Sequence, residues 1–248
     1  MGSIKTLIHV HTNYSLDSNI TPEALARFAE SQGIGCIAVT DHDTIDGARH
    51  LASITDVKVV IGEEVTTRDG DLIGLFLTHR IEPGLSARET ALAIKAQGGV
   101  VLAPHPFVKL FGCGLRDSVW DILDLLDAVE ICNAQNLLKR PDRDARRFAD
   151  ETGLVKYVGA DTHMADSIAP CYQLIRDFSG PGDFLEALAS AELQVGRHPL
   201  SYFASSGVRT IRYLLGFRLP AAYGLNCAPD PKPTPVTAEP LCGRSAMA

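Results

Sequence analysis

Short apolar runs alternate with helix-like segments along most of this chain, and this alternation constrains its fold more than any other feature. The strand-like runs lie at 4–10, 36–40, 57–61, 71–77, 100–103, 129–132, 155–158 and 193–195. Several are apolar throughout, as are the strands of a buried parallel sheet. Strand followed by helix, repeated about seven times, predicts a (β/α) barrel or an open doubly wound sheet.

Helix-like segments fill the intervals between these runs, at 21–30, 45–53, 87–97, 118–126, 141–152, 182–190 and 200–215. Thr21 is placed to cap the first helix and Pro22 to begin it, and Gly33 follows its end. The run 71–77 is different, because a turn at 68–70 precedes it. That turn predicts a hairpin in an otherwise parallel sheet.

The composition is that of an ordinary globular protein. Of 248 residues, 46% are hydrophobic, and the mean hydropathy is +0.06. Because one α/β barrel can use a chain of this length, we expect a single domain over residues 1–219. Residues 220–248 are rich in proline, and we expect a disordered tail there. Neither a signal peptide nor a membrane-spanning run is recognisable, so we expect a cytoplasmic protein.

Charge and cysteine content argue against several classes of protein. The net charge of −7 disfavours non-specific nucleic-acid binding through a basic surface, so no stable nucleic-acid complex is expected. The six cysteines are scattered without a C-x-x-C pair. Neither a disulfide framework nor a zinc ribbon is therefore predicted.

Histidines and carboxylates gather at the carboxyl ends of the strand-like runs. His9 and His11 end the first run two residues apart, so their side chains share a face, and a loop can return Asp17 to them. Later strand ends carry His42, Glu64, His105, Asn133, Asp161 and His163. Barrel active sites are built from these ends, and imidazole with carboxylate suits a borderline divalent cation. The sequence therefore predicts a metal centre.

Each of these residues also has a structural interpretation when it is taken alone. His105 could be a rigid turn residue between two prolines, and Asp161 could cap a helix. The coincidence at so many strand ends favours the metal centre instead. Away from the strand ends we expect surface or structural roles for His50, His79 and His198.

Five motifs, in this order, resemble those of the polymerase and histidinol phosphatase (PHP) superfamily. They are His9-x-His11-x-x-x-Ser15-x-Asp17, Thr40-Asp41-His42-Asp43, Gly62-Glu63-Glu64, Pro104-His105-Pro106 and Asp161-x-His163. Their order and spacing cover about residues 5–200. The resemblance implies a distorted seven-stranded (β/α) barrel with two or three divalent metals at the strand ends. Manganese is the expected metal, with iron or zinc as alternatives.

The resemblance also implies how the ligands are divided among the metals. One metal would be held by His9, His11, Glu64 and Asp161. Glu64 would bridge it to a second metal, which His105 also holds. A third would be held by Asp17, His42 and His163.

Two positions differ from those of some superfamily members. Histidinol phosphatases often have histidine where Asp17 stands, whereas the nucleotide-phosphate hydrolases tend to have aspartate. Some members have histidine where Asn133 stands, and asparagine is a poor ligand for a transition metal. The nucleotide branch also tends to carry a helical insertion, for which the interval 65–104 is too short.

The chemistry expected of such a centre is hydrolysis of phosphate esters by a metal-activated hydroxide. Asp161 and Asp41 are candidates to accept the proton of the water or to orient a ligand histidine. For Asp41 we favour the orienting role. Arg68 and Arg143 are candidates to bind a second phosphate or a carboxylate of the substrate.

The expected substrate is a small phosphorylated metabolite, with nucleotides among the candidates. An exonuclease acting 5′ to 3′ on short oligonucleotides is an alternative, which needs a basic groove with aromatic platforms. Trp120, Phe107, Phe111 and Lys109 give it thin support. A non-catalytic metal-bound accessory domain is a further alternative. A hydrolase of C–N or C–O bonds usually needs a ligand lysine after a strand, and no lysine is so placed.

Overall fold

The computed structural model describes residues 2–109, 112–165, 168 and 171–198. The expected helix at 200–215 and the expected disordered tail at 220–248 lie outside these ranges. No helix within the described ranges is both long enough and apolar enough to cross a bilayer.

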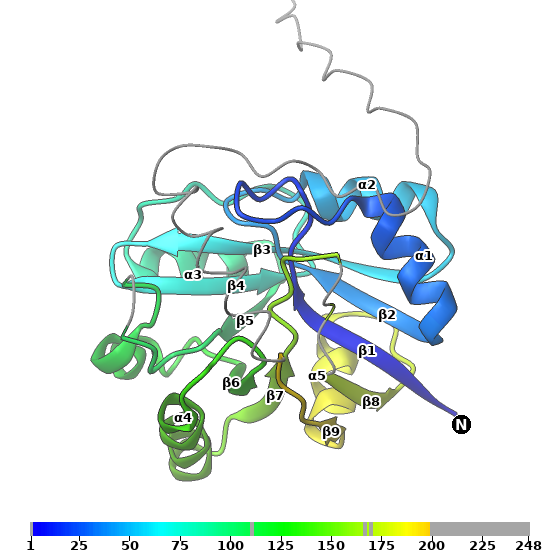
Figure 1. Ribbon diagram of the computed structural model, residues 1–248. Coiled ribbons are helices and arrows are strands. Elements are labelled where there is room, and N and C mark those ends of the chain that lie inside the picture. Colours follow the sequence, from blue (N-terminus) through cyan, green and yellow to red (C-terminus); the bar gives the residue numbers. More distant parts are fainter. Residues whose placement is uncertain (1, 110–111, 166–167, 169–170, 199–248) are drawn as a thin grey trace, which may run out of the picture.

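A mixed sheet of nine strands forms the centre of the molecule (Figure 1). Across the sheet the strands are β7 (Val155–Gly159), β6 (Ala128–Asn133), β5 (Val100–Ala103), β4 (Gly70–Leu75), β3 (Lys58–Thr67), β2 (Ile34–Val39), β1 (Ser3–Val10), β8 (Tyr172–Arg176) and β9 (Glu192–Gln194). β4 runs antiparallel to β3 and β5, which confirms the hairpin predicted around the turn at 68–70. β8 is antiparallel to both β1 and β9.

The first seven strands curl into a nearly closed barrel because β1 changes its neighbour along its length. Its first half, Ser3–Thr6, pairs with β8. Beyond that point Val10 forms a parallel bridge with Thr162, which follows β7. The backbone N–H of Ala160 donates to the carbonyl of Ile8 at 2.9 Å. The carboxyl end of β1 is therefore joined to β7, and the barrel is closed at the end that holds the site.

The sheet has nine strands where the family resemblance implies seven. β8 and β9 occupy the seam that β7 leaves open beside the first half of β1. Gln173 of β8 is buried in this seam, where its Oε1 accepts from the N–H of Val158 at 2.6 Å and its Nε2 donates to the carbonyl of Thr6 at 3.3 Å. A buried polar residue disrupts the apolar alternation of a strand, and for this reason β8 was not predicted from the sequence.

Helices join the strands and cover the barrel. They are α1 (Pro22–Gln32), α2 (Asp46–Ile54), α3 (Ala87–Ala96), a 3₁₀ helix (Arg116–Ile122), α4 (Lys139–Thr152) and α5 (Pro181–Ala189). The segment predicted as a helix near 118–126 is the 3₁₀ helix. The strand predicted at 57–61 continues to Thr67, so Glu64 lies within β3 rather than after its end.

Two apolar clusters show which side chains face into the barrel. One cluster takes members from strands and from helices α1 to α4. The other takes alternate residues of the barrel strands, such as Ile8, Ala38, Val60, Ile73 and Leu102, together with residues of α5. Because α1 to α4 contribute nothing to the second cluster, it fills the barrel interior, and α5 seals one end of it.

The N-cap of α1 gives a testable prediction about the stability of the fold. Thr21 Oγ1 accepts a hydrogen bond from the N–H of Ala24 at 3.2 Å, and Gly33 ends the helix in the left-handed conformation. We expect Thr21→Ala to lower the free energy of unfolding by about 1 kcal/mol, because an N–H at the helix start loses its partner. Urea denaturation would measure this loss.

Ser31→Ala on the same helix is the matched control, because Ser31 is exposed and lies outside the cap. Its effect should stay within about 0.5 kcal/mol. Equal losses in the two variants would contradict the capping role of Thr21.

Candidate metal centre

The carboxylate of Glu64 lies at the middle of a cluster of histidines in the mouth of the barrel. Its Oε2 is 3.1 Å from Nε2 of His9 and 3.2 Å from Nε2 of His11. Its Oε1 is 3.0 Å from Nε2 of His105. Three ring nitrogens from two different segments therefore converge on one buried carboxylate.

Further carboxylates and histidines extend this cluster. Asp161 Oδ1 is 3.7 Å from Nε2 of both His9 and His11. The ring of His163 stacks on His11 at a centroid distance of 4.1 Å. Asp17 Oδ2 is 3.1 Å from Nε2 of His163 and 3.7 Å from Nε2 of His42.

All eight residues predicted as metal ligands thus come together. We call them the metal centre: His9, His11, Asp17, His42, Glu64, His105, Asp161 and His163. Donor atoms of seven of the eight form three overlapping groups, namely His9–Glu64–His105, His9–His11–Asp161 and His11–His42–His163, and Asp17 adjoins the last group through His163 and His42. Within each group the donor atoms lie within 4.8 Å of one another. Imidazole and carboxylate donors at this spacing fit divalent transition metals.

The backbone is strained at three residues of the centre. His9, His105 and Asp161 have φ values of 66°, 28° and 42°. Non-glycine residues rarely occupy this left-handed region, and the strain costs of the order of 1 kcal/mol or more at each position. Such outliers gather at functional sites, so the strain supports a functional role for these residues.

Glu130 of β6 supports the centre, although the sequence analysis did not identify it. Its Oε1 lies 2.9 Å from Nδ1 of His9, and its Oε2 accepts from the N–H of His105 at 2.6 Å. Gly159 makes room for it, because a Cβ at that position would lie 1.5 Å from Glu130 Oε1. The available signal was a lone carboxylate in an apolar strand, which must find partners when it is buried.

Comparisons with known proteins agree with this geometry. The PHP domain family model matches residues 8–110. The uncharacterized protein MJ1587 of Methanocaldococcus jannaschii is 41% identical over 144 residues, which are 53% of this chain and 82% of that protein. The chain belongs to the PHP domain family.

Two solved structures share the fold of this PHP domain. One is a two-domain protein from Bacteroides vulgatus containing a predicted PHP-like metal-dependent phosphoesterase, with a TM-score of 0.61 and 17% identity. The match covers 77% of this chain and 65% of that protein, slightly less than two thirds of its length. The other is the lesion-specific endonuclease PfuEndoQ from Pyrococcus furiosus, with a TM-score of 0.58 and 13% identity over 77% of this chain and 57% of the endonuclease.

Asp41 holds the loop that carries His11 rather than facing the metal centre. It is fully buried, and its oxygens accept from the N–H and hydroxyl of Thr12 at 2.6 and 2.7 Å and from Ser15 Oγ at 2.9 Å. Ser15 Oγ lies 3.3 Å from Nδ1 of His11 and accepts from the N–H of His42 at 2.9 Å. Asp41 therefore reaches two histidines of the centre through Ser15, which suits an orienting role.

Asn133 is committed to hydrogen bonds within the wall of the site. Its Nδ2 donates to Glu130 Oε2 and to Asp161 Oδ2, both at 2.9 Å, and its Oδ1 accepts from the N–H of Gln135 at 2.8 Å. The side chain of Gln135 in turn donates to Asp161 Oδ1 at 2.8 Å and lies 2.9 Å from Nδ1 of His163. These amides hold the side chains of Asp161 and His163 in place, and Gln135 was not recognised from the sequence.

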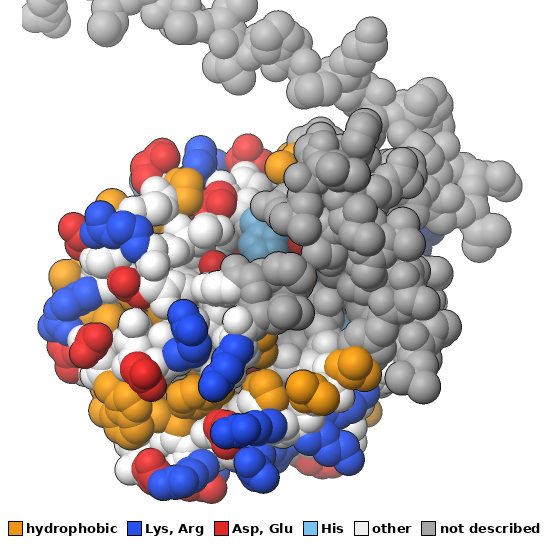
Figure 2. Space-filling model, turned by 60° about the vertical axis from the view of Figure 1, so that its left-hand side comes forward, with side chains coloured by type: hydrophobic (Ala, Val, Ile, Leu, Met, Phe, Trp, Pro, Cys, Tyr) orange, Lys and Arg blue, Asp and Glu red, His pale blue; other side chains and the backbone are white. Residues whose placement is uncertain are grey.

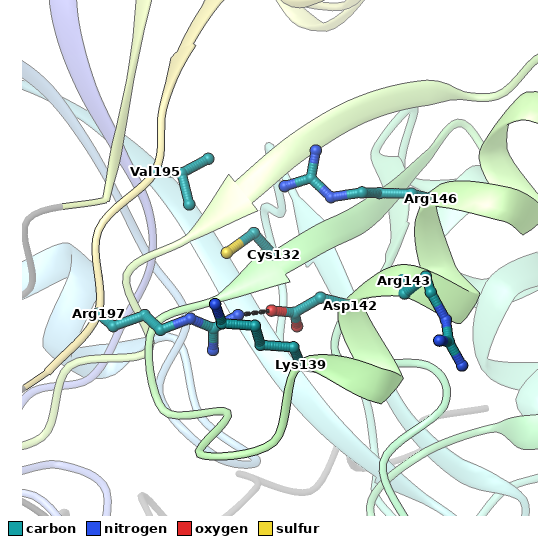
Figure 3. Close-up of a pocket in the computed structure, with 7 residues that line it drawn as sticks. All are labelled: Cys132, Lys139, Asp142, Arg143, Arg146, Val195 and Arg197. Atoms are coloured by element: carbon teal, nitrogen blue, oxygen red, sulfur yellow. Dashed lines mark hydrogen bonds and ion pairs between the residues drawn. The ribbon is translucent and has the colours of Figure 1, made fainter.

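The two arginines expected to bind substrate lie elsewhere. The exposed side chain of Arg68 donates to Glu89 Oε2 at 3.0 Å. Arg143 lines a basic cavity of about 340 Å³ together with Cys132, Lys139, Asp142, Arg146, Val195 and Arg197 (Figure 3). Cys132 belongs to the apolar cluster that lies between the strands and helices α1 to α4. The cavity is therefore on the outer face, away from the metal centre.

The carboxylates of the centre favour positive charge beside them, as the pKa values of the histidines show. Burial opposes ionisation of His42, but Glu64 and Asp17 raise its pKa to about 9. Burial likewise opposes the charge of His9, yet Asp161 and Glu64 hold its pKa well above the usual range. By contrast, burial and His163 lower the pKa of His11 to about 3. The carboxylates thus attract positive charge that either protons or metal ions can supply.

These shifts predict that metal affinity depends on pH. A histidine must lose its proton to bind a metal, and His42 keeps its proton up to about pH 9. Affinity should therefore rise between pH 7 and 9, by up to about tenfold per pH unit for each proton released. Competition of Mn²⁺ binding against a chelator across this range would measure the rise. A flat profile would contradict protonation of these histidines in the metal-free protein.

Glu130→Gln tests the support that this carboxylate gives to His9. The amide keeps the shape of the side chain but removes the charge that orients the histidine and raises its basicity. We expect a loss of about 10–100-fold in Mn²⁺ affinity. Glu151→Gln on the exposed face of α4 is the matched control and should bind Mn²⁺ as the unmodified chain does. Equal affinities in both variants would rule out this role for Glu130.

Proposed function

We propose that this PHP domain hydrolyses phosphate esters of a small phosphorylated metabolite, nucleotides included, in a metal-dependent reaction. The observation that carries the proposal is the set of three overlapping groups of imidazole and carboxylate donors in the mouth of the barrel. Glu64 belongs to one group and lies beside histidines of the others. Membership of the PHP family supports the same reaction class.

The residues present can hold up to three metals. The first would be held by His9, His11, Glu64 and Asp161, and Glu64 and His105 would share the second. The third would be held by Asp17, His42 and His163. Divalent metals held there supply positive charge that acidifies a water molecule and offsets the charge of the phosphate oxygens.

The protein side chains position this chemistry and do not form a covalent intermediate. The hydroxyl of Ser15, 3.3 Å from Nδ1 of His11, is engaged with Asp41 and with the backbone of His42, and that of Ser18 donates to the carbonyls of His11 and His163. Asp161 Oδ1 lies 3.3 Å from Nδ1 of His163, and Asp161 is our candidate to accept the proton of the water. Its pKa is held low because, although burial opposes its charge, His9 and His163 stabilise it. Asp161 is thus available as an anion at neutral pH.

The substrate would approach from the side of Asp17 and His42. The His42 side chain is 32% exposed and that of Asp17 is 20% exposed, whereas His9, His11 and Glu64 are buried. Histidine side chains reach the surface on the face drawn in Figure 2. These partly exposed side chains would receive the phosphate of a small molecule. The basic cavity lies on the outer face of β6, away from these side chains.

Phosphate release after reconstitution with Mn²⁺ tests the proposal. Phosphomonoesters, nucleoside bisphosphates and short oligonucleotides would be compared as substrates. We expect Mn²⁺-dependent turnover of a phosphomonoester or bisphosphate, and loss of that turnover in His105→Ala, because this variant removes a donor that contacts Glu64. His79→Ala, at an exposed position, is the matched control and should keep full activity.

Two outcomes would contradict the proposal, and a third would change the role assigned to His105. Turnover of oligonucleotides alone would establish the exonuclease alternative. If none of these substrates were hydrolysed although metal was bound, the chain would be a non-catalytic metal-bound accessory domain. Unfolding of His105→Ala, followed by circular dichroism, would indicate that His105 serves the fold.

A further inference from the structure

A fourth group of donor atoms adjoins the metal centre and contains a cysteine. A carboxylate oxygen of Asp71, a ring nitrogen of His105 and the sulfur of Cys113 lie within 4.8 Å of one another. Asp71 is buried and Cys113 is partly buried. Neither residue belongs to the motifs found in the sequence, and both reach His105 only through the folding of the barrel.

The β3–β4 hairpin directs Asp71 into the barrel mouth. Glu64 is paired with Ile73, and Thr66 is paired with Asp71. Residues paired across an antiparallel ladder, and residues two apart on one strand, share a face of the sheet. Ile73 belongs to the cluster that fills the barrel. Asp71 therefore lies on the same inner face as Glu64.

Cys113 is held against the start of β4 by close backbone contacts. The N–H of Asp71 donates to the carbonyl of Cys113 at 2.7 Å. At Gly70, where φ is +126°, a Cβ would lie 2.6 Å from the backbone nitrogen of Leu115. The segment after Gly112 thus packs directly on the hairpin, which brings the thiol to Asp71 and His105.

The neighbouring strand cannot supply a ligand at this position. His105 follows β5, which lies between β4 and β6 in the sheet. On the β6 side, both functional groups of the Asn133 amide are already committed to hydrogen bonds. On the β4 side stand Asp71 and Cys113. Nδ1 of His105 is buried and its Nε2 lies beside Glu64, and the Cys113 side chain forms a hydrogen bond with the ring.

We propose that Asp71, His105 and Cys113 bind one divalent metal together, and that the thiolate makes this position select Zn²⁺ over Mn²⁺. A soft thiolate with imidazole and carboxylate is a donor set typical of zinc, whereas carboxylate-rich sites suit manganese. The inference rests on the proposed metal-dependent function and deepens it. The centre would then hold different metals at different positions, with zinc at His105.

X-ray absorption of the full chain loaded with one equivalent of Zn²⁺ under reducing conditions tests this proposal. We expect a sulfur neighbour about 2.3 Å from the zinc, the usual Zn–S distance. Cys113→Ser should lose this sulfur signal. Asp71→Asn should keep it but bind Zn²⁺ more weakly. Cys36→Ala is the matched control, because Cys36 is buried in the barrel interior, and it should keep the signal unchanged.

A second measurement does not depend on the folding of any variant. Alkylation of Cys113 in the unmodified chain, located by mass spectrometry, should slow when Zn²⁺ is added and stay unchanged with Mg²⁺. Alkylation at the same rate with and without Zn²⁺ would overturn the proposal. So would a zinc spectrum without sulfur, or a sulfur signal that survives Cys113→Ser.

The outcome is separable from that of the activity test. A sulfur signal without phosphate release would overturn the proposed function and leave the zinc site standing. Phosphate release without a sulfur signal would overturn only the zinc site.

Discussion

The burial of the Glu64 carboxylate among histidine rings is the interaction on which the rest of this structure depends. A carboxylate that is 1% exposed is costly to bury unless cations or hydrogen-bond donors surround it. His9, His11 and His105 surround it, and they come from the first strand and from the loop after β5. Although burial opposes ionisation of Glu64, His9 and His42 hold its pKa well below the usual range. The barrel must close for these residues to meet, so the fold and the site form together.

Along each of two barrel strands, the inward-facing side chains are apolar in the barrel interior and polar, or small, near the carboxyl end. Ala128 belongs to the apolar interior, and Glu130, two residues further along β6, faces the same side and contacts His9. Tyr157 of β7 is buried in the same interior, and Gly159 two residues later leaves the space that Glu130 fills. The strand alternation that builds the core therefore also aims the polar residues into the mouth.

Much of this was predictable from the sequence, because strand ends in a barrel converge whatever the details of the chain. The sequence placed His9 and His11 together by strand alternation, and they do converge. The structure reaches that result differently, since His9 has a left-handed backbone where β1 ends. Glu130, Asp71 and Cys113 were missed, because their proximity to histidines depends on sheet order and on loop packing. Arg68 was proposed for the substrate because it follows a site motif, but Glu89 of α3 engages its side chain.

The residues of the metal centre differ in solvent exposure, and this difference suits them to different roles. The donors nearest the barrel axis, His9, His11 and Glu64, are buried, whereas His42 and Asp17 border solvent. Electrostatic interactions are stronger where water is excluded, so the inner donors are suited to hold charge permanently. His42 and Asp17 are already in contact with solvent. Replacing that water by a phosphate oxygen therefore costs less free energy there than at the buried donors. A hydrolase with this centre would therefore bind metal most tightly at His9, His11 and Glu64. It would receive the substrate beside His42 and Asp17.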